Sequence, residues 1–431
     1  MKKIGKYEII RELGKGATSV VYEAVDPFQQ RRVAIKMVFP EALGDKDLGR
    51  RYRKLFVTEA SLAGKLSHPH IVAIYDAVAD DEASYIVMEY VDGTTLEKFT
   101  RVENLLPIQL IVEIVFKCAR ALDYAARQGV IHRDIKPANI LLAGEADIKI
   151  SDFGAALTST IETTQVTGVG SPAYMSPEQV KEQPLTHQTD IFSLGVVMYQ
   201  LLTGRLPFHG TNNYSMIYQI INVDPPPPSE FRPEVSPQID VIVKRALEKN
   251  TASRYQTWEE LTHDLVSALG AQHTPREGML ESEKFDALRK LEFFRYFSDV
   301  ELWEVLRLAT WHQHPRDTVL IQEGDVGSSF FLLSTGEVKV VKQERLLNVL
   351  KAGECFGEMA YLGKQKFQRS ASVVSISDVT VIEIRAETLA QASELCRPHF
   401  HGSFLEVLVA RLTMANMRLS QLLADRNISV F

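Results

Sequence analysis

Cysteine is scarce in this chain. The 431 residues include three cysteines, Cys118, Cys355 and Cys396, which lie far apart and form no C-x-x-C pair. This spacing excludes a disulfide framework and a cysteine-rich zinc site, and it fits a reducing cytoplasm. Long hydrophobic runs are missing too. The most apolar stretch, residues 191–202, is interrupted by polar residues and falls short of the ~20 apolar residues that a membrane span needs.

A surplus of positive charge and a signal peptide are also absent. The net charge is -7, which argues against a general nucleic-acid-binding protein and favours solubility. The amino terminus, MKKIGKYEII, has no apolar signal-peptide core. We therefore expect a cytoplasmic protein without a nucleic-acid or membrane partner. Because 431 residues are too many for one ordinary core, two or three domains are expected.

The clearest pattern in the chain is at residues 132–154, HRDIKPANILLAGEADIKISDFG. Two short apolar segments inside it predict a β-hairpin with Gly144 in the turn. Such a hairpin would bring Asp134, Asn139 and Asp152 to one end. Their oxygen-rich side chains suit Mg²⁺ ions that also carry phosphates. The order and spacing resemble the catalytic motifs of protein kinases.

A glycine-containing segment near the amino terminus has a second pattern. Residues 13–21 read LGKGATSVV, and Val-Ala-Ile-Lys follows at residues 33–36 in a region of short alternating strands. Gly14 and Gly16 would let the backbone approach phosphates. A lone G-x-G also fits an ordinary hairpin turn, but the following strand and the downstream catalytic motifs favour phosphate binding. Ser19 stands where the kinase pattern usually has a third glycine.

The next segments complete a small lobe. Residues 47–66 are expected to form a helix in which Glu59 pairs with Lys36, although an ordinary exposed glutamate also fits. Strands are expected at 71–78 and 84–91, and the second of these matches the end of a kinase small lobe and its hinge.

Beyond the hinge the apolar period becomes helical. A helix is expected over 107–128, ended by Gly129, and an apolar helix over 190–202. Between them, residues 155–175 are rich in Thr and Ser and have no clear period, and Ser-Pro-Glu follows at 176–178. This region is typical of a kinase activation segment.

Residues 7–268 resemble a eukaryotic-type serine/threonine protein kinase of the sort common in bacteria, because every catalytic motif occurs in order. Lys136, two residues after Asp134, is similar to the Ser/Thr branch rather than the Tyr branch. The resemblance implies a bilobal kinase domain over 1–269, with a small lobe at 1–91 and a large lobe at 92–269. It also implies ATP and Mg²⁺ (or Mn²⁺) as cofactors and protein substrates with a Ser or Thr acceptor.

The resemblance assigns roles to individual residues. The implied catalytic set is Asp134, Lys136, Asn139, Lys36 and Glu59, and the implied metal ligands are Asn139 and Asp152. The implied ATP contacts are Leu13, Gly14, Lys15, Gly16, Ala17, Thr18, Ser19, Val20, Val21, Ala34, Lys36, Met88, Glu89, Val91 and Leu141. In the activation segment, the candidates for phosphorylation are Thr163, Thr164 and Thr167, with Ser171 at the acceptor site. Arg254 would form the family's buried ion pair with Glu178.

After the kinase-like region the pattern changes. Residues 270–282 are rich in glycine and polar residues and are expected to be a linker. A helix is expected over 285–308, evenly spaced short strands over 318–384 suggest a jelly roll, and a helical tail is expected from 387 to about 425. The second domain is therefore predicted at 283–431, and the fold class of the chain is α+β.

Two motifs inside the strand region can hold a ribose cyclic phosphate. Residues 356–360 read FGEMA and residues 369–373 read RSASV. The glycine turn offers backbone N–H groups, Glu358 would accept from the ribose 2′-hydroxyl, and Arg369 would pair with the phosphate. This resembles the cyclic-nucleotide-binding domain of catabolite-activator proteins and cyclic-nucleotide-dependent kinases. The implied contacts with cAMP or cGMP are Phe356, Gly357, Glu358, Met359, Ala360, Arg369 and Ser370.

More than one function remains open from sequence. The favoured hypothesis is a kinase regulated by a cyclic nucleotide. In the family that it resembles, a hydroxyl just after the phosphate-binding arginine can serve guanine, but serine there is also seen with adenine, so Ser370 leaves cAMP only slightly ahead of cGMP. Residues 363–368 lengthen the usual spacing between Glu358 and Arg369, so the alternative is an active kinase whose degenerate jelly roll only docks partners or dimerises. Self-association through the C-terminal helices is a partner hypothesis. A cyclic-nucleotide-dependent transcription factor is disfavoured, because few residues follow the tail helix and a helix-turn-helix needs more.

Overall fold

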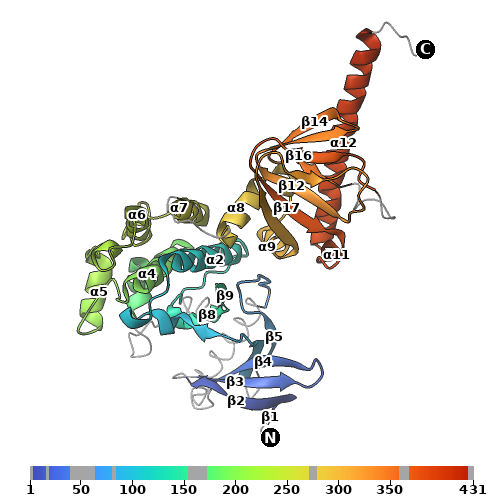
Figure 1. The fold of residues 1–431 in the computed structure, drawn as a ribbon. Helices are drawn as coiled ribbons and strands as arrows, with labels where there is room; N and C mark the ends of the chain where they lie inside the picture. The colour runs from blue at the N-terminus through green and yellow to red at the C-terminus, as the bar shows by residue number, and fades with distance from the viewer. Residues whose placement is uncertain are drawn as a thin grey trace. The chain divides into compact units, whose positions relative to one another are not determined.

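The structure is a computed structural model that describes residues 3–15, 19–38, 64–79, 84–144, 146–153, 172–270, 279–358 and 368–425. The chain divides into two compact units, Met1–Glu277 and Gly278–Phe431 (Figure 1). The division falls inside the linker predicted at 270–282. That linker is shorter than predicted, because Gly270 still belongs to a helix and another helix begins at Glu281.

The first unit begins with a six-stranded antiparallel sheet. Its strands are β1 (Lys3–Ile4), β2 (Tyr7–Lys15), β3 (Ser19–Asp26), β4 (Arg31–Val38), β5 (Ile74–Ala79) and β6 (Ser84–Glu89), in the order β1-β2-β3-β4-β6-β5. Alternating apolar side chains form its core, among them Tyr7, Val33 and Val87. β5 begins later than the predicted residue 71, because Ile71 instead forms a bridge with Ile150.

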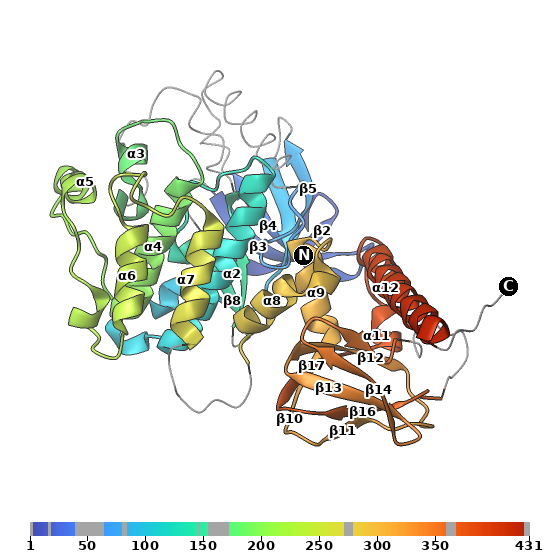
Figure 2. The ribbon, with the colours of Figure 1, turned by 90° about the horizontal axis from the view of Figure 1, so that it is seen from above.

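The rest of the first unit is mostly helical. Its helices are α2 (Ile108–Arg127), α3 (Pro177–Val180), α4 (Gln188–Thr203), α5 (Asn213–Asn222), α6 (Pro237–Ala246) and α7 (Trp258–Gly270). Figure 2 shows α2, α4, α6 and α7 lying side by side. The helices predicted at 107–128 and 190–202 are confirmed. α4 is buried along almost its whole length, so the apolar run at 191–202 is a core helix.

The second unit opens with two helices, α8 (Glu281–Lys290) and α9 (Asp299–Leu308), so the prediction of one continuous helix over 285–308 is wrong. A new helix starts because Ser298 caps α9. The Ser298 hydroxyl accepts from the Glu301 N–H, and the Glu301 carboxylate accepts from the Ser298 N–H at 2.7 Å. This reciprocal capping box fixes a helix start that the apolar period alone does not reveal.

Two four-stranded antiparallel sheets form the body of the second unit. One has the order β10 (Ala309–His314), β17 (Val379–Arg385), β12 (Ser329–Thr335), β15 (Cys355–Phe356), and the other has the order β11 (Val319–Ile321), β16 (Ser372–Ser375), β13 (Glu337–Lys342), β14 (Arg345–Lys351). Buried residues of both sheets, including Leu333, Val338 and Val381, form one core. This arrangement fits the predicted jelly roll. β10 lies outside the predicted strand region, because four of its six residues are polar and hide the alternation.

Two helices, α11 (Ala386–Leu389) and α12 (Cys396–Asp425), follow the strands in place of the single tail predicted from residue 387. The break contains Ser393, whose N–H and hydroxyl both donate to the carboxylate of Glu304 in α9. Phe400 and Phe404 of α12 pack against Phe330, and Figure 1 shows α12 continuing beyond the strands. The exposed apolar side chains of α12 include Leu405, Val409 and Leu412.

The three cysteines are buried thiols. Cys118 lies in α2, Cys355 in β15 and Cys396 at the start of α12. Burial raises the pKa of each thiol to about 12. Each side chain therefore stays protonated at neutral pH and acts as a small apolar group in the core.

Candidate functional site

The predicted catalytic hairpin is confirmed. β8 (Ile140–Ala143) and β9 (Asp147–Ile150) pair with Ile140 opposite Ile150, and β7 (Thr94–Thr95) extends the sheet on the other side of β8. Gly144 in the turn has a φ of 64°, a left-handed value that glycine adopts without strain. The buried isoleucines of this hairpin anchor the loop that precedes it and the segment that follows it.

The predicted catalytic side chains meet in two groups around this hairpin. Lys136 Nζ donates to Asp134 Oδ2 at 2.7 Å, and Asn139 Nδ2 donates to the backbone oxygen of Asp134 at 2.8 Å and to its Oδ2 at 3.1 Å. Lys36 Nζ of β4 pairs with Asp152 Oδ1 at 2.5 Å, although 116 positions separate the two residues in sequence. The fold therefore joins the small-lobe lysine to the carboxylate that follows β9.

The backbone of the catalytic loop is held by Asp190 in the first turn of α4. Its Oδ2 accepts from the His132 N–H and its Oδ1 accepts from the Arg133 N–H, each at 2.7 Å. Arg133 has a φ of 67°, which is unfavourable for a residue with a β-carbon. These two bonds stabilise that conformation and fix the direction of Asp134. The apolar pattern predicts only a helix start at Asp190; a lone carboxylate beside a buried apolar run is the signal that would reveal its role.

Asp152 is held in a similar way. Its φ is 61°, and its neighbours are fixed by His132, whose Nε2 lies 2.9 Å from the Ser151 backbone oxygen and whose ring packs on Phe153 with centroids 4.6 Å apart. Burial favours the neutral form of Asp152. Attraction to Lys36 and the hydrogen bond from it outweigh that effect, so the pKa of Asp152 lies below its usual value. Asp152 is therefore an anion at neutral pH.

Asn139 and Asp152 have the right atoms for a divalent metal ion. The amide nitrogen of Asn139 is tied to Asp134, so its Oδ1 is the atom left to act as a ligand. In Asp152, Oδ1 pairs with Lys36 and Oδ2 is the second oxygen. Carboxylate and amide oxygens are the ligands that Mg²⁺ and Mn²⁺ accept alongside phosphate oxygens and water. The donor set therefore fits the ions predicted from sequence.

The residues predicted to surround ATP come from β2, β3, β4, the hinge and β8. Val20 and Ala34 are buried, whereas Met88 and Leu141 are half-buried. The remaining described members are exposed (Leu13, Gly14, Lys15) or half-buried (Ser19, Val21, Glu89, Val91).

Glu89, predicted at the hinge, already has partners for its backbone N–H and its carboxylate. Its N–H donates to the Ala73 backbone oxygen at 2.8 Å, and its carboxylate pairs with Lys149 Nζ at 2.9 Å. Of the backbone groups of Glu89 that were predicted to bond adenine, the N–H is therefore already paired within the fold.

Some predicted site residues lie outside the described part of the chain. These are Gly16, Ala17, Thr18 and Glu59 of the kinase-like unit, the activation-segment residues Thr163, Thr164, Thr167 and Ser171, and Met359 and Ala360 of the second unit.

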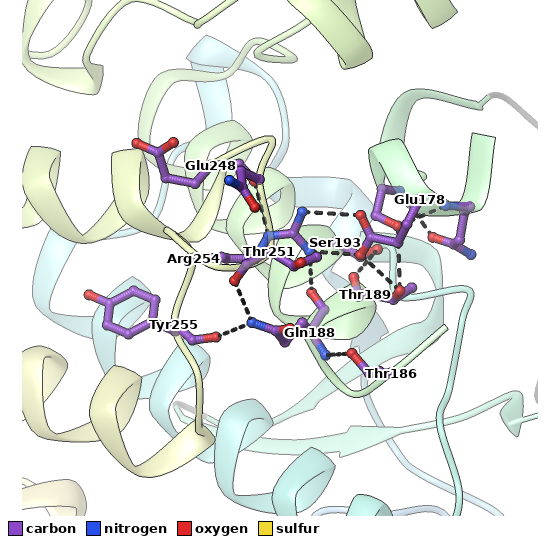
Figure 3. A network of polar contacts seen from close by, with 12 residues as sticks. Glu178, Thr186, Gln188, Thr189, Ser193, Glu248, Thr251, Arg254 and Tyr255 are labelled. Carbon is purple, nitrogen blue, oxygen red and sulfur yellow. Dashed lines mark hydrogen bonds and ion pairs between the residues drawn. The ribbon is translucent and has the colours of Figure 1, made fainter. Parts of the chain in front are cut away.

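A buried ion pair supports the large lobe behind the catalytic loop (Figure 3). Arg254 Nη1 lies 2.7 Å from Glu178 Oε1 and Nη2 lies 3.1 Å from Oε2, as the sequence predicted. Glu178 also accepts from the Thr189 hydroxyl at 3.0 Å, and Arg254 donates to the backbone oxygens of Gln188 and Glu248. The network links α3 to the start of α4, which also carries Asp190.

The second unit contains a cavity of about 240 Å³ lined by the residues predicted to bind a cyclic nucleotide. Phe356, Gly357, Glu358, Arg369 and Ser370 all line it. Apolar side chains, including Val340 and Leu350, and the amide of Asn348 line it as well. The structure therefore brings the FGE and RS motifs together across the gap between them in sequence.

Arg369 is clamped at the wall of this cavity. Nη1 donates to the Gly357 backbone oxygen at 3.0 Å, and Nη2 donates to the Ser329 backbone oxygen at 2.8 Å. Gly357 has a φ of 77°, and a β-carbon there would lie 2.7 Å from Nη1, so glycine is needed for this contact. Burial lowers the pKa of the Arg369 guanidinium despite attraction from Glu383 and other acids. An anion bound in the cavity would offset that burial.

Glu358 has a partner that the sequence did not reveal. Arg411 of α12 donates through Nη1 to Glu358 Oε1 at 2.5 Å and through Nη2 to the backbone oxygen of Cys355. Arg411 also lines the cavity. A tail helix therefore contributes to the site that the sequence assigned to the strands alone.

Comparison with known proteins identifies both units. Residues 7–266 match the family model described as protein kinase domain, and residues 311–394 match the model described as cyclic nucleotide-binding domain. The first match covers more than half of the chain, so the chain belongs to the protein kinase family. The predicted α+β fold, with a kinase domain followed by a cyclic-nucleotide-binding domain, is confirmed.

The chain is similar to serine/threonine kinases of bacteria. It is 39% identical to a probable serine/threonine-protein kinase of Streptomyces coelicolor, over 62% of this chain and 40% of that protein. It is 38% identical to the serine/threonine-protein kinase PknB of Mycobacterium leprae (62% and 43%) and 37% identical to PrkC of Bacillus subtilis (62% and 41%). The chain thus spans about two fifths of the length of these relatives.

Within the described ranges, no helix combines the length and the apolar composition that crossing a membrane requires.

Proposed function

We propose that this chain is an ATP-dependent protein serine/threonine kinase regulated by a cyclic nucleotide. The observation that carries the kinase assignment is the convergence of Lys36 with Asp152 and of Asp134 with Lys136 and Asn139. A divalent ion bound by Asn139 and Asp152 would neutralise charge on the phosphates of ATP. A cytoplasmic location is part of the proposal, and cell fractionation tests it.

The residues of the chain act by positioning and by electrostatics. Asp134 accepts a hydrogen bond from the acceptor Ser or Thr hydroxyl and aims its oxygen at the γ-phosphate, and Lys136 stabilises the charge on that phosphate. Lys36 holds the α- and β-phosphates. The hydrogen bonds of Asp190 to the catalytic loop fix these directions before substrate arrives.

Phosphorylation of the activation segment is a further part of the proposal. Arg133 precedes the catalytic Asp134, and burial lowers the pKa of its guanidinium, with Asp190 opposing this effect. A phosphate on Thr163, Thr164 or Thr167 would offer about two negative charges to such a cation and order the segment. Phosphopeptide mass spectrometry of the active protein tests this; unmodified threonines in fully active protein would contradict it.

The second unit is proposed to bind cAMP or cGMP. Arg369 would pair with the cyclic phosphate, and Glu358 would accept from the ribose 2′-hydroxyl. Regulation requires that the nucleotide bind one state of the chain more tightly than another, because equal affinity shifts no equilibrium. The alternative is a kinase whose second unit binds no nucleotide and only docks partners or dimerises.

One experiment tests the regulated kinase. The full chain is assayed for phosphate transfer to a generic Ser/Thr substrate, with and without cAMP or cGMP, while calorimetric titration measures binding. We expect a dissociation constant in the micromolar range or tighter and a change in activity of about 5- to 150-fold, which corresponds to a coupling of ~1–3 kcal/mol. In the Arg369→Ala variant, the ratio of activities with and without nucleotide should fall to one.

The controls separate binding from folding. Arg369→Lys keeps the charge without the planar fork and should retain part of the response. Thermal unfolding of each variant shows whether the second unit is intact. An active kinase that binds no nucleotide at millimolar concentration would support the docking alternative, and binding without a change in activity would reject the coupling.

Dimerisation through α12 is also proposed. Leu405, Leu408, Leu412 and Ala415 follow the spacing of an a/d seam, and Leu405 and Leu412 are well exposed. A second copy of α12 would cover these side chains. Sedimentation equilibrium tests this; a chain that stays monomeric at micromolar concentration would contradict it.

A further inference from the structure

Glu23 of β3 is a buried carboxylate on the side of the six-stranded sheet that is predicted to face ATP. Its neighbours Tyr22 and Ala24 pack in the apolar core on the opposite side of that sheet. Because side chains alternate along a strand, Glu23 shares its side with Val21, a predicted ATP contact. The Glu23 side chain is nevertheless only 4% exposed. A carboxylate buried in this way requires compensating partners.

Two arginines compensate the charge of Glu23. Arg11 Nε of β2 donates to Glu23 Oε2 at 2.8 Å, and Arg32 Nε of β4 donates to Oε1 at 2.7 Å. The strand register explains the contacts, because Arg11 lies directly opposite Glu23 and Arg32 lies opposite Val25, two residues further along β3. Both carboxylate oxygens are therefore bound, and they fix the direction of both guanidinium groups.

Both arginines also contact Tyr90, in the segment predicted to be the hinge. The Arg32 guanidinium lies over the Tyr90 ring, 3.9 Å from its centroid, and Arg11 Nη2 donates to the Tyr90 hydroxyl at 3.4 Å. A cation over an aromatic face is attracted by the ring. Tyr90 lies between Glu89 and Val91, two of the predicted ATP contacts. The network therefore joins β2, β3 and β4 to the segment that would bind adenine.

The other contacts of this segment leave a distinct role to Tyr90. The Glu89 carboxylate pairs with Lys149 Nζ of β9 at 2.9 Å, so Glu89 is held by the catalytic hairpin and Tyr90 by the strands. Arg32 also pairs with Asp92 at 3.5 Å, but the Asp92 side chain is 85% exposed, so this ion pair contributes little. The position of the backbone at Val91 therefore depends mainly on Tyr90 among these side chains.

We infer that Glu23 is a positioning residue for ATP, which holds Tyr90 through Arg11 and Arg32 and so fixes the backbone next to adenine. The inference rests on the proposed binding of ATP and adds a residue that no catalytic motif contains. Loss of this restraint would displace the adenine contacts but leave Asp134 in place. The effect should therefore appear in the affinity for ATP and not in kcat.

A double-mutant cycle on the full chain tests this inference. Calorimetry measures the affinity for the non-hydrolysable β,γ-imido analogue of ATP with Mg²⁺ in wild type, Glu23→Gln, Tyr90→Leu and the double variant. Each single variant should bind about tenfold more weakly, the equivalent of one charge-assisted hydrogen bond. Because both changes break the same chain of contacts, the double variant should also be weaker by about tenfold and not by about a hundredfold.

Steady-state kinetics provides a second readout. In both single variants the KM for ATP should rise, while kcat at saturating ATP stays within about twofold of wild type. Glu8→Gln is the matched control. Glu8 of β2 forms an exposed ion pair with Lys3 at 3.0 Å in the same sheet, so this variant should bind the analogue with wild-type affinity.

Arg32→Lys decides the case in which Glu23→Gln does not fold. Lysine keeps a positive charge beside Glu23 but lacks the planar group that lies over the Tyr90 ring. Arg32→Lys should therefore weaken binding as much as Tyr90→Leu does. Wild-type affinity in folded Arg32→Lys would overturn the inference.

The remaining outcomes are equally decisive. A Glu23→Gln protein that unfolds at a lower temperature but binds the analogue as wild type does would show a merely structural role. A hundredfold loss in the double variant would show that Glu23 acts independently of Tyr90, and a fall in kcat with an unchanged KM would place it in the chemical step; each of these overturns the inference alone. Failure of wild type to bind the analogue overturns the proposed ATP binding together with it.

Discussion

The Asp134→Asn variant should lose phosphate transfer by about 10²- to 10⁴-fold, the contribution typical of a positioned acid–base group. Asparagine has nearly the same shape, so the contact with Asn139 can persist while the charged acceptor for the substrate hydroxyl is lost. Because Asp134 acts on the hydroxyl, the loss should appear mainly in kcat and leave the KM for ATP little changed. Steady-state kinetics with a generic Ser/Thr substrate measures both.

Two further variants complete this test. Lys36→Met should reduce activity to a similar extent but also raise the KM for ATP, since Lys36 would contact its phosphates. Asp224→Asn, which changes an exposed carboxylate after α5, is the control and should be fully active. Near-normal activity of purified, folded Asp134→Asn would refute the catalytic assignment.

Arg254→Ala should lower the free energy of unfolding of the first unit by about 3–5 kcal/mol, because it leaves the carboxylate of Glu178 buried without its cation. Arg254 is fully buried and Glu178 nearly so. Each of them has further hydrogen-bond partners in the network of Figure 3. Urea unfolding followed by tryptophan fluorescence measures the change. Lys3→Ala, which removes an exposed ion pair with Glu8, should cost no more than about 1 kcal/mol.

The pH dependence provides an independent check of this ion pair. Burial would raise the pKa of Glu178, but the hydrogen bond and charge of Arg254 lower it below the usual value of 4.5. A carboxyl with a lowered pKa contributes stability above its unfolded pKa, and that contribution disappears as the pH falls through the folded pKa. Wild type should therefore lose stability on acidification below about pH 4.5 by more than Arg254→Ala does. Parallel pH profiles of the two proteins would contradict this.

Local patterns predicted much of both sites. The catalytic hairpin, its glycine turn and the Glu178–Arg254 pair all follow motifs whose spacing fixes their geometry. The S-x-x-E pattern that begins at Ser298 marks the start of α9. The apolar period continues across this position, however, and it predicted one continuous helix. β10 was missed because four of its six residues are polar.

The contacts that sequence could not predict are those between distant elements. Asp190 reaches the catalytic loop across 58 positions, and Arg411 reaches Glu358 across 53. Nothing in either local pattern points to its partner, since an arginine on a helix is most often a solvated residue. Only the packing of α4 beneath the catalytic loop and of α12 against β15 brings these groups together.

The buried cysteines give the chain a native reporter of local opening. A thiol with a pKa of about 12 reacts negligibly with a thiol reagent at pH 8, whereas an exposed thiol has a pKa of ~8.5 and reacts readily. Labelling therefore requires a structural fluctuation that uncovers the sulfur, and its rate reports the free energy of that fluctuation. Cys118 monitors the first unit, whereas Cys355 and Cys396 monitor β15 and the start of α12 in the second. Mass spectrometry of the three sites can thus follow each unit separately in the unmodified protein.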